Sequence, residues 1–346
     1  MLPGWGRPVG DVLRVIDFGP VSPLRSQTLW HAAAYGVSEG EPPTLSFTRP
    51  SAPYVCLGYH RSLAEVDQEY CHREGLPIYR RMVGGGPVYL DDGQLFFQIC
   101  LPARAAPALR QEALRMLLEP AVAAFQAVGV PAALDADLEI CDGDRKICGH
   151  GAGQIEDAVV VCGNLIQRFD HERATRVLAL PDPGLRAETL RLMRRYVAAT
   201  PADPQEFQAA MISAYATALG LRVAPGQLTG AERAGLTDLD AQFSSVQWLA
   251  GPEQPPARTP ARTVKVRAGV WTVGAASGDA RIVVSVVRGT VDRAWLRAAG
   301  LNGMTQAAES ALAGVPVAAV PDVLARFGDP GRQLAAAFAG ADGTRL

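Results

Sequence analysis

The sequence predicts an α+β protein with a mixed β-sheet and a second, smaller α+β domain. Short β-like runs and helical runs alternate through residues 11–101 without a regular β–α–β rhythm, which favours a mixed sheet over a doubly wound one. A chain of 346 residues is also longer than one hydrophobic core usually supports. We therefore expect a large domain at residues 1–250, a linker at 251–262 and a small domain at 263–346.

The elements of the large domain follow from apolar and β-branched runs that turn residues separate. Residues 24–36 and 64–74 have a helical pattern, and residues 108–129 form the clearest amphipathic helix, with Pro120 as an expected bend. Several more helices are expected within residues 171–245. The expected strands are 12–18, 44–49, 53–59, 77–81, 87–90, 94–100, 137–140, 145–149 and 158–167.

The small domain is expected to follow a proline-rich stretch. Residues 251–262 contain four prolines and few apolar side chains, which is typical of a linker. Residues 264–296 predict a twisted antiparallel meander with a turn around Gly278–Asp279. Helices are expected near residues 303–313, 318–327 and 330–340.

The composition is that of an ordinary globular protein, with 48% apolar and 20% charged residues. A net charge of −2 and a pI near 6.2 argue against nucleic-acid binding. No run of 18 apolar residues predicts a membrane span, and the first twenty residues lack a signal-peptide core. We expect a cytoplasmic monomer. The basic stretch 191–196 is interpreted as a solvated helix face, or alternatively as a rim that receives an acidic partner protein.

The spacing of the cysteines and histidines suits neither a disulfide framework nor a metal site. The six cysteines form no C-x-x-C pair, and the five histidines show no ligand spacing. We therefore assign no metal to protein side chains.

The first candidate site is the stretch RRMVGGGPVYLDDGQ at residues 80–94. Three consecutive glycines between two predicted strands indicate a bulge or a close approach of backbone to ligand. Backbone N–H groups in such a turn can face an anion, and adjacent arginines add positive charge. The alternative is a plain turn that links two strands.

The second candidate is Lys146, in the stretch DGDRKICGHGAGQ at residues 142–154. The chain contains only two lysines, Lys146 and Lys265, among its 33 basic residues. An ammonium is compact and mobile, whereas a guanidinium is a planar fork. We hypothesise that Lys146 bridges a substrate carboxylate and a nucleotide α-phosphate, a contact worth about 3–4 kcal/mol in a transition state. The alternative is an exposed strand lysine.

These two stretches together resemble a known family, the lipoate–protein ligases. Residues 80–94 resemble that family's RR-x-x-GGG-x-V-x-H-D-x-G-N signature, and DGDRKICG resembles its lysine motif. Further similar stretches are VCLGYHRS (55–62), AVVVCGNLIQRFD (158–170) and the region from VKVRAGVW to about Gly328, which includes LAGVPV (312–317) and is similar to the family's C-terminal accessory domain.

The resemblance implies a mixed-sheet catalytic domain of the biotin/lipoate-ligase type and an accessory domain. It implies an ATP-dependent enzyme that, with Mg²⁺, converts lipoic acid (or octanoate) to lipoyl-AMP and transfers the acyl group to a lysine of a lipoyl carrier protein. That carrier is a lipoyl domain of a 2-oxoacid dehydrogenase E2, a glycine-cleavage H protein or a related lipoate-binding protein.

The resemblance also implies roles for individual residues. Lys146 is the expected catalytic residue and also contacts ATP and lipoyl-AMP. The other expected nucleotide-binding residues are Arg81, Gly84, Gly85, Gly86, Pro87, Val88 and Tyr89. Secondary candidates are Arg80, Asp91, Asp137, Gly149, Cys162 and Asn164. The apolar runs Val55–Leu57 and Phe96–Ile99 are candidate walls of a tunnel for the acyl tail.

The sequence departs from the family pattern in several places. Leu90 replaces a histidine, Gln94 replaces an asparagine, Cys162 and Asn164 stand where histidine and threonine are typical, and His60–Arg61 stand where glutamine is common. Two alternatives therefore remain. One is an octanoyl or lipoyl transferase that forms a cysteine thioester; residues 131–138, a dozen residues before the lysine, contain no cysteine, which leaves Cys162 as the candidate nucleophile. The other, motivated by Leu90, is a non-catalytic lipoate-binding protein.

Overall fold

The computed structural model describes residues 10–106, 110–252 and 261–339. Contacts within the chain group it into two compact units. The large unit comprises residues 1–170 and 198–253, and the small unit comprises residues 171–197 and 254–346. The expected large domain at 1–250 therefore differs from the observed large unit, because residues 171–197 belong to the small unit. Most of the expected linker, residues 253–260, lies outside the described residues.

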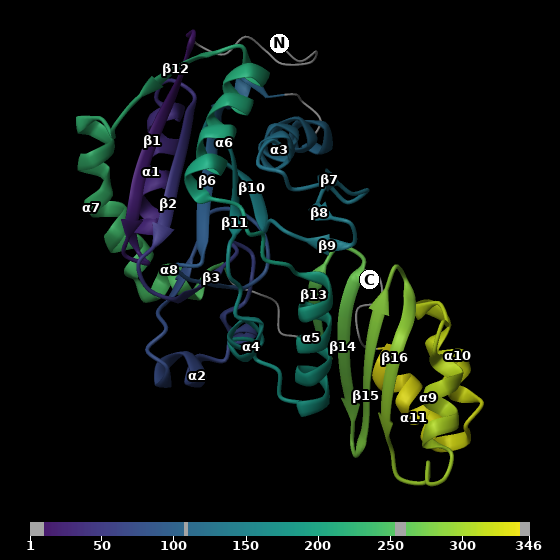
Figure 1. Ribbon diagram of the computed structural model, residues 1–346. Helices are drawn as coiled ribbons and strands as arrows, with labels where there is room; N and C mark the ends of the chain where they lie inside the picture. Colours follow the sequence, from purple (N-terminus) through teal and green to yellow (C-terminus); the bar gives the residue numbers. More distant parts are fainter. Residues whose placement is uncertain (1–9, 107–109, 253–260, 340–346) are drawn as a thin grey trace. The chain divides into compact units, whose positions relative to one another are not determined.

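A six-stranded mixed sheet forms the centre of the large unit (Figure 1). Its strand order is β10-β11-β6-β2-β1-β12. Strand β1 pairs in parallel with β2 and β12, whereas β2, β6, β11 and β10 are joined by antiparallel pairing. The strands are β1 (Val12–Val21), β2 (Thr44–Pro50), β6 (Gln94–Pro102), β10 (His150–Ile155), β11 (Ala158–Ile166) and β12 (Arg222–Pro225). The predicted mixed-sheet α+β fold is confirmed.

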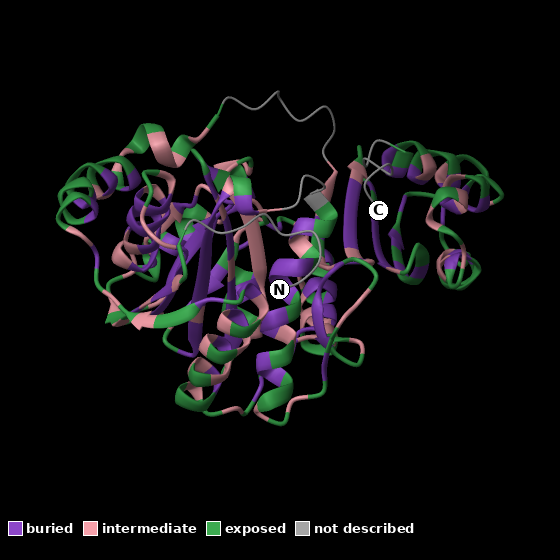
Figure 2. Cartoon of the chain, turned by 90° about the horizontal axis from the view of Figure 1, so that it is seen from above, coloured by how far each residue is buried: buried purple, intermediate pink, exposed green. Residues whose placement is uncertain are grey.

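Helices cover both faces of this sheet because its strands are apolar on both sides. One face packs against α3 (Arg110–Ala127) and α6 (Pro204–Leu219), and the other against α1 (Arg25–Ser38) and α7 (Gly230–Ser244). Successive side chains of a strand point to opposite faces. Accordingly Phe97 contacts the first helix pair, and Cys100 lies in the core beneath α1. The buried residues of Figure 2 follow this layering.

Local capping residues determine where two of these helices begin. The Asp203 carboxylate accepts hydrogen bonds from the first-turn N–H groups of α6, and Gly220 ends that helix with φ 65°. Thr229 and Glu232 form a capping box at the start of α7. Pro120 lies inside α3, which continues through it to Ala127. Proline has no backbone N–H, so one helix hydrogen bond is lost at this position. The packing of α3 in the core of the large unit offsets this loss.

Two three-stranded sheets hold the loops of the large unit. One has the order β4-β3-β5, from β3 (Tyr54–Leu57), β4 (Ile78–Arg80) and β5 (Val88–Leu90). The other has the order β7-β8-β9, from β7 (Ala132–Leu134), β8 (Ile140–Asp142) and β9 (Arg145–Lys146). Short helices complete the unit: η1 (Leu63–Glu65), α2 (Gln68–Arg73), η2 (Ala103–Ala105) and α8 (Val246–Ala250).

The small unit is built on the predicted antiparallel meander. Its strands are β13 (Arg262–Arg267), β14 (Val270–Ser277), β15 (Ala280–Val287) and β16 (Thr290–Arg297), in that order in the sheet. One face buries an apolar core against the helices that end the chain. These are α9 (Thr305–Leu312), η3 (Val317–Ala319), α10 (Val320–Ala325) and α11 (Gly328–Ala339).

The other face of the meander explains why residues 171–197 belong to the small unit. This segment contains α4 (His171–Arg176) and α5 (Pro183–Tyr196). Leu185 of α5 packs with Val283 of β15, and a Cβ atom added at Gly274 would lie 2.8 Å from Leu185. The hydroxyls of Thr189 and Thr272 are 2.8 Å apart. The meander is thus a sheet between two helical layers, and one of these layers comes from earlier in the sequence.

None of the described helices is both long and apolar enough to cross a membrane.

Candidate functional site

The loop of residues 81–87, which joins β4 to β5, is held in shape by its own arginine. We call it the glycine loop. Arg81 donates from Nε and Nη2 to the Gly84 carbonyl (3.1 and 2.8 Å), from Nη2 to the Gly86 carbonyl (3.1 Å) and from Nη1 to the Cys56 carbonyl (3.0 Å). A guanidinium has five N–H groups, so one remains for a ligand. Arg81, which the sequence predicted as a nucleotide-binding residue, therefore serves chiefly to hold the shape of the loop.

The glycine loop presents backbone donors to its surroundings. Gly85 and Gly86 are exposed, and their N–H groups donate to no described residue. A Cβ atom added at Gly86 would meet no atom within 4 Å, so ligand atoms can approach this backbone closely. Consecutive N–H groups of this kind form an anion-binding concavity. This arrangement suits the phosphate that the sequence predicts here.

Two close contacts require glycine in and beneath this loop. Gly85 has φ 105°, and an added Cβ atom would lie 2.5 Å from Nη2 of Arg81. A Cβ atom added at Gly58, which follows β3, would lie 2.0 Å from the Gly85 carbonyl oxygen. The Tyr59 N–H also donates to the Val83 carbonyl over 3.1 Å. The stretch at residues 55–62 therefore supports the loop from below.

Arg80, a secondary candidate from the sequence, is part of the scaffold and has no donor left for a nucleotide. Its side chain is completely buried. Its guanidinium donates to carbonyls of residues 58, 59 and 61 on one side and to those of Trp248, Leu249 and Ala250 on the other. Arg80 therefore joins the end of α8 to the segment that supports the glycine loop.

A buried histidine that the sequence did not single out anchors the start of the loop. The Met82 N–H donates to Nε2 of His31 over 3.2 Å, and the other ring nitrogen, Nδ1, lies 2.7 Å from the Gln27 carbonyl. Burial lowers the pKa of His31 to about 3, so the ring is neutral. A neutral ring has one acceptor and one donor nitrogen, which matches these two partners. His31 is thus a fixed acceptor for the loop backbone.

The strand after Lys146 packs directly against the glycine loop. The Gly84 N–H donates to the Ala152 carbonyl of β10 over 3.4 Å. Cβ atoms added at Gly151 and Gly153 would each lie 3.1 Å from loop atoms, so the glycines of β10 permit this approach. The chain from Lys146 to Gly151 spans at most about 18 Å even when fully extended. The two sequence motifs therefore lie in one part of the large unit.

Lys146 lies on β9 and is paired with a carboxylate rather than pointing into bulk solvent. Its Nζ is 2.9 Å from Oε1 of Glu139, and the side chains are 19% and 6% exposed, respectively. In the hairpin, Lys146 pairs with Cys141. Glu139 precedes Cys141 by two residues, so it is the diagonal cross-strand neighbour of the lysine. Sequence reasoning missed Glu139, although the two-residue spacing could have indicated it.

Asp137, the carboxylate that the sequence did select in this stretch, has an exposed side chain. Its N–H donates to Oδ1 of Asp135 over 3.0 Å, and the same oxygen accepts the Glu139 N–H over 2.8 Å. Asp137 therefore lies in a turn that Asp135 stabilises. The turn places Glu139, not Asp137, beside the lysine.

Two residues that depart from the family pattern contact each other. Nδ2 of Asn164 donates to Oε1 of Gln94 over 2.8 Å, and both side chains are buried. Oδ1 of Asn164 accepts the Gly149 N–H over 2.7 Å. On the other side, Nε2 of Gln94 lies 3.4 Å from the Tyr89 carbonyl. The amide pair thus connects the segment after Lys146 to the strand after the glycine loop, with Gly149 and Tyr89 at its ends.

Cysteines lie near the site, but their environments keep the thiols protonated. Sγ of Cys162 is 3.5 Å from the Gly151 carbonyl, beside the strand that supports the glycine loop. Burial raises the pKa of the thiols of Cys56, Cys100 and Cys162, although Arg81 opposes this at Cys162. Burial raises the pKa of Cys148 to about 12. A cysteine nucleophile reacts as thiolate, which these surroundings disfavour.

Other residues that the sequence analysis singled out lie in the core or in a turn. Leu90 packs with Tyr54 and Cys56 in the buried cluster of the β4-β3-β5 sheet. Oδ1 of Asp91 accepts the Gly93 N–H over 2.9 Å, and burial raises the pKa of this carboxyl group. The tunnel-wall prediction is wrong for Phe97 and Ile99, because strand alternation places them against α3 and α6.

Three potential metal ligands cluster beside Lys146. Oxygen and sulfur atoms of Asp135, Glu139 and Cys141 all lie within 4.8 Å of one another. Mg²⁺ prefers six oxygen ligands, whereas this set includes a thiol and a carboxylate that Lys146 already occupies. The cluster does not suit a protein-held Mg²⁺. An ion held mainly by nucleotide phosphates is compatible with it.

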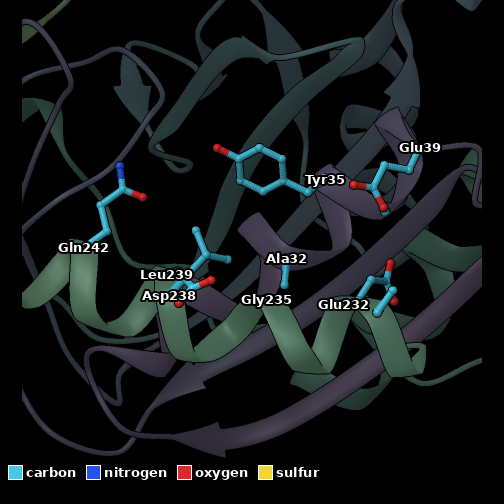
Figure 3. A pocket seen from close by; sticks show the side chains of 10 residues that line it. Ala32, Tyr35, Glu39, Glu232, Gly235, Asp238, Leu239 and Gln242 are labelled. Carbon is cyan, nitrogen blue, oxygen red and sulfur yellow. The ribbon is translucent and has the colours of Figure 1, made fainter.

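A cavity of about 290 Å³ lies elsewhere, between α1 and α7. Figure 3 shows side chains around it from these two facing helices, with Tyr35 from α1, Glu39 directly after α1, and Glu232 and Asp238 from α7. Glu232 is paired with the buried Arg14, Nη2 to Oε1 2.6 Å. Carboxylates repel an anionic acid and a nucleotide. The cavity therefore does not suit an anionic acid or a nucleotide.

Comparisons with known proteins agree with the geometry. Residues 24–215, more than half of the chain, match the family described as the lipoyl protein ligase A/B catalytic domain. An octanoyltransferase LipM from Symbiobacterium thermophilum is 28% identical over 269 residues, covering 68% of this chain and 97% of that protein. A lipoate-protein ligase A subunit 1 from Thermoplasma acidophilum is 25% identical over 228 residues, covering 61% and 86%.

Solved structures show the same fold. A bi-partite lipoate protein ligase from Thermoplasma acidophilum, studied with its E2 lipoyl domain, has a TM-score of 0.64 at 23% identity and covers 71% of this chain and 99% of its own. A lipoate-protein ligase A bound with ATP has a TM-score of 0.60 at 23% identity, covering 69% and 98%. LipL1 of P. falciparum in complex with lipoate has a TM-score of 0.54 at 12% identity, covering 91% and 93%.

Proposed function

Because the chain belongs to the lipoyl protein ligase A/B catalytic domain family, we propose that it is an ATP-dependent lipoate–protein ligase. In the first step, a carboxylate oxygen of lipoate (or octanoate) bonds to the α-phosphorus of ATP. The bond from that phosphorus to the bridging oxygen breaks, and pyrophosphate leaves. In the second step, the amine of a carrier lysine bonds to the acyl carbon, and AMP leaves with the electron pair of the broken C–O bond.

Two observations support this proposal: the ion pair of Lys146 with Glu139, and the packing of the glycine loop against β10, which begins four residues after Lys146. The exposed N–H groups of Gly85 and Gly86 and the remaining N–H of Arg81 suit the phosphates of ATP. The Lys146 ammonium suits the oxygens on which charge concentrates during attack at the α-phosphorus. Glu139 keeps the ammonium oriented. Mg²⁺ bound to the phosphates would neutralise the pyrophosphate leaving group.

One further observation favours a ligase over a cysteine-dependent transferase. The thiols of Cys148 and Cys162 have raised pKa values, contrary to what a thiolate nucleophile needs.

The second candidate function is octanoyl transfer through a cysteine thioester, and the LipM relatives favour it. In that reaction a cysteine thiolate takes the octanoyl group from a thioester donor, and the carrier lysine then takes it from the cysteine. Cys162 is the candidate nucleophile because it is the cysteine that is partly exposed. Its position beside Gly151 would put the thioester near the glycine loop.

The proposed acceptor is the lysine of a lipoyl carrier protein: an E2 lipoyl domain, a glycine-cleavage H protein or a related lipoate-binding protein. The bi-partite ligase of Thermoplasma acidophilum, which shares this fold, was studied with an E2 lipoyl domain. A cytoplasmic monomer suits this role, because such carriers are folded protein domains that an enzyme must meet in solution.

One experiment separates the two candidate functions. The full chain is incubated with Mg²⁺-ATP, lipoate and each class of carrier domain, and pyrophosphate and carrier mass are measured. A ligase releases pyrophosphate only when lipoate is added, and the carrier gains one lipoyl group. A transferase loads the carrier from an octanoyl thioester without ATP. Lipoate binding without either reaction would identify a non-catalytic protein and overturn the proposal.

Cysteine variants sharpen the result. A ligase keeps its transfer rate in Cys162→Ala and Cys148→Ala, whereas a transferase loses it in the variant that lacks the nucleophile. Cys71→Ala serves as the matched control, because Cys71 lies in α2, away from the loop contacts described above. Loss of transfer in Cys162→Ala alone would replace the ligase assignment by the transferase.

A further inference from the structure

One strand of the small unit exposes an aromatic side chain between two unpaired arginines. Strand β16 is the edge strand of the four-stranded sheet (Figure 1). Its residues Ala294 and Leu296 face the apolar core. Arg293, Trp295 and Arg297 point to the opposite face, and Trp295 is 37% exposed. Neither arginine forms an ion pair with any residue that the structure describes.

The helix α5 covers this face of the sheet only in part. Leu185 and Thr189 pack over β14 and β15. At β16 the only described contact from α5 is an ion pair of Arg191 with Asp292, the extra residue of a β-bulge opposite Ser285 and Val286. The three side chains of β16 beyond this bulge have no covering helix. We call them the β16 patch: Arg293, Trp295 and Arg297.

Charges around the β16 patch are predominantly positive. Arg281 of β15 pairs with Arg297 in the strand register and adds a third exposed guanidinium. Two carboxylates lie close to the patch: Asp292, which shares Arg191 with Glu188, and Glu309, whose Oε1 accepts the Leu296 N–H over 2.8 Å. The basic stretch 191–196, by contrast, is largely occupied: Arg194 binds Glu172 over 2.6 Å, and Arg195 lies over the Tyr196 ring. The sequence suggested residues 191–196 as one possible surface for an acidic partner protein. The exposed arginines of β16 suit such a partner better.

We infer that the β16 patch is a docking surface for an acidic folded protein and, resting on the proposed function, that this protein is the lipoyl carrier domain. Tryptophan and arginine are the residues most enriched at the energetic centres of protein interfaces. The backbone edge of β16 is partly closed, because Val291 bonds to residues 314 and 315 and the Leu296 N–H donates to Glu309, so a partner would contact the side chains of the patch. Three guanidiniums that form no ion pair with any described residue select a partner rich in aspartate and glutamate.

A second copy of this chain is the weaker occupant on the same observations. A twofold contact places the same patch of both copies in one interface. Arg281, Arg293 and Arg297 of one copy would then meet the same arginines of the other, and like charges in an interface are destabilising.

Direct binding tests the inference. The isolated lipoyl domain of an E2 component and an H protein, each with a net negative charge, are titrated onto the immobilised full chain at 50 and 300 mM NaCl. Arg293→Glu and Trp295→Ala are each expected to weaken the Kd for the carrier by about tenfold or more. Arg326→Glu, a matched charge reversal in the helical layer of the same unit, should change it less than about twofold. Binding by the wild type should weaken at the higher salt concentration.

The outcomes separate this inference from the proposed function. Pyrophosphate release with lipoate and ATP does not involve the carrier, so Arg293→Glu and Trp295→Ala should leave it unchanged while the KM for the carrier rises. If only Arg293→Glu and Trp295→Ala weaken carrier binding, but the wild type releases no pyrophosphate, the docking surface is supported and the ligase assignment is refuted. Equal effects of all three substitutions, unchanged carrier binding, or no binding by the wild type would refute the patch. Sedimentation that shows a dimer abolished by Trp295→Ala would also refute it, because the occupant would be a second copy.

Discussion

The glycine loop and the lysine hairpin, the two halves of the candidate site, are stabilised in different ways. The loop is held by many contacts: four hydrogen bonds of Arg81, the acceptor nitrogen of His31 and the carbonyl of Ala152. The groups that it presents are backbone N–H groups. The hairpin presents one side chain, Lys146, which Glu139 holds through a single ion pair.

This difference indicates which property matters in each half. Backbone donors cannot be exchanged by mutation, so the loop depends on its shape, and shape depends on many neighbours. The ammonium can be removed by one substitution, so the hairpin depends on one charge. Substitutions in the loop should therefore change stability and activity together, whereas substitution of the lysine should change activity far more than stability.

The largest effect is expected for Lys146→Ala. Loss of the ammonium should lower the rate of lipoyl-AMP formation by about 10²–10³-fold, because the charge acts on the transition state. Lys146→Arg should remain impaired, since a planar fork cannot follow the carboxylate as it becomes an acyl phosphate. Pyrophosphate release under single-turnover conditions measures this rate.

Two controls accompany this prediction. Lys265→Ala removes the other lysine of the chain, which lies over the Trp271 ring in the small unit, and should leave the rate unchanged. Lys146→Ala/Glu139→Gln avoids an unpaired buried carboxylate, whose cost in stability could otherwise lower activity. A rate in this double variant within threefold of the wild type would contradict the assigned role of the ammonium.

The second largest effect is expected for Gly85→Ala. The new Cβ atom would lie 2.5 Å from Arg81 Nη2, at a backbone φ of 105°. Strain of this type costs about 1–3 kcal/mol, and relief requires the loop to move. We expect a lower free energy of unfolding, measured in urea, together with a higher KM for ATP.

Gly40→Ala is the matched control for the loop variant. Gly40 has φ 114°, and a Cβ atom there would meet nothing within 4 Å. It should lower stability by a similar backbone strain and leave the KM for ATP unchanged. An equal rise in KM in both variants would show that strain anywhere in the fold, rather than loop shape, controls nucleotide binding.

A third, smaller effect concerns pH and the anchor of the loop. Burial lowers the pKa of His31 from 6.5 to about 3. Between these values the unfolded chain binds a proton that the folded chain does not, so this group makes the free energy of unfolding rise with pH, and it adds nothing above pH 6.5. Lowering the pH from 7.5 to 5.5 should therefore cost the wild type about 1.4 kcal/mol through His31.

His31→Gln tests that dependence, because a glutamine oxygen can accept the Met82 N–H without titrating. Urea unfolding at pH 7.5 and 5.5 should show a pH effect smaller than that of the wild type by about 1.4 kcal/mol. His60→Gln, the same exchange at an exposed residue that follows β3, is the control. Identical pH dependence in all three proteins would contradict a buried neutral ring.

The smallest effect is expected for the amide pair that joins the two halves. Gln94→Ala and Asn164→Ala should each lower the free energy of unfolding by about 1–3 kcal/mol, because each leaves a buried amide without its partner. The double variant should lose less than the sum, with a coupling of about 0.5–1.5 kcal/mol. Equilibrium unfolding of the four proteins measures this cycle.

A second buried pair in the same sheet serves for comparison. The Ser46 hydroxyl donates to Oε1 of Gln98 over 2.8 Å. Its double-mutant cycle should show a similar coupling in stability, but only the Gln94 and Asn164 variants should also slow pyrophosphate release. Equal effects of both pairs on that rate would mean that the amide pair does not connect the two halves of the site.

Much of the fold and the location of the site could be predicted from the sequence. Apolar alternation predicted most strands of the sheets but missed β7, β10 and β12, and the strand expected at 137–140 begins only at Ile140. Turn residues predicted the meander with its turn at Gly278–Asp279. The glycine triplet and the isolated lysine predicted two halves of one site, and the structure places them in one part of the large unit. These features are local, because periodicity, turn chemistry and glycine conformations depend on neighbouring residues.

Contacts between residues far apart in the sequence were decided only by the tertiary structure. His31 anchors Met82, Asn164 binds Gln94, and Arg80 caps α8, although each pair is separated by tens of residues or more. The same holds for α5, which lies in the sequence between strands β11 and β12 of the large unit and packs on the sheet of the small one. No local sequence pattern encodes which buried polar group forms a hydrogen bond with which other one. Each pairing depends on the complete fold, which buries both groups and places them next to each other.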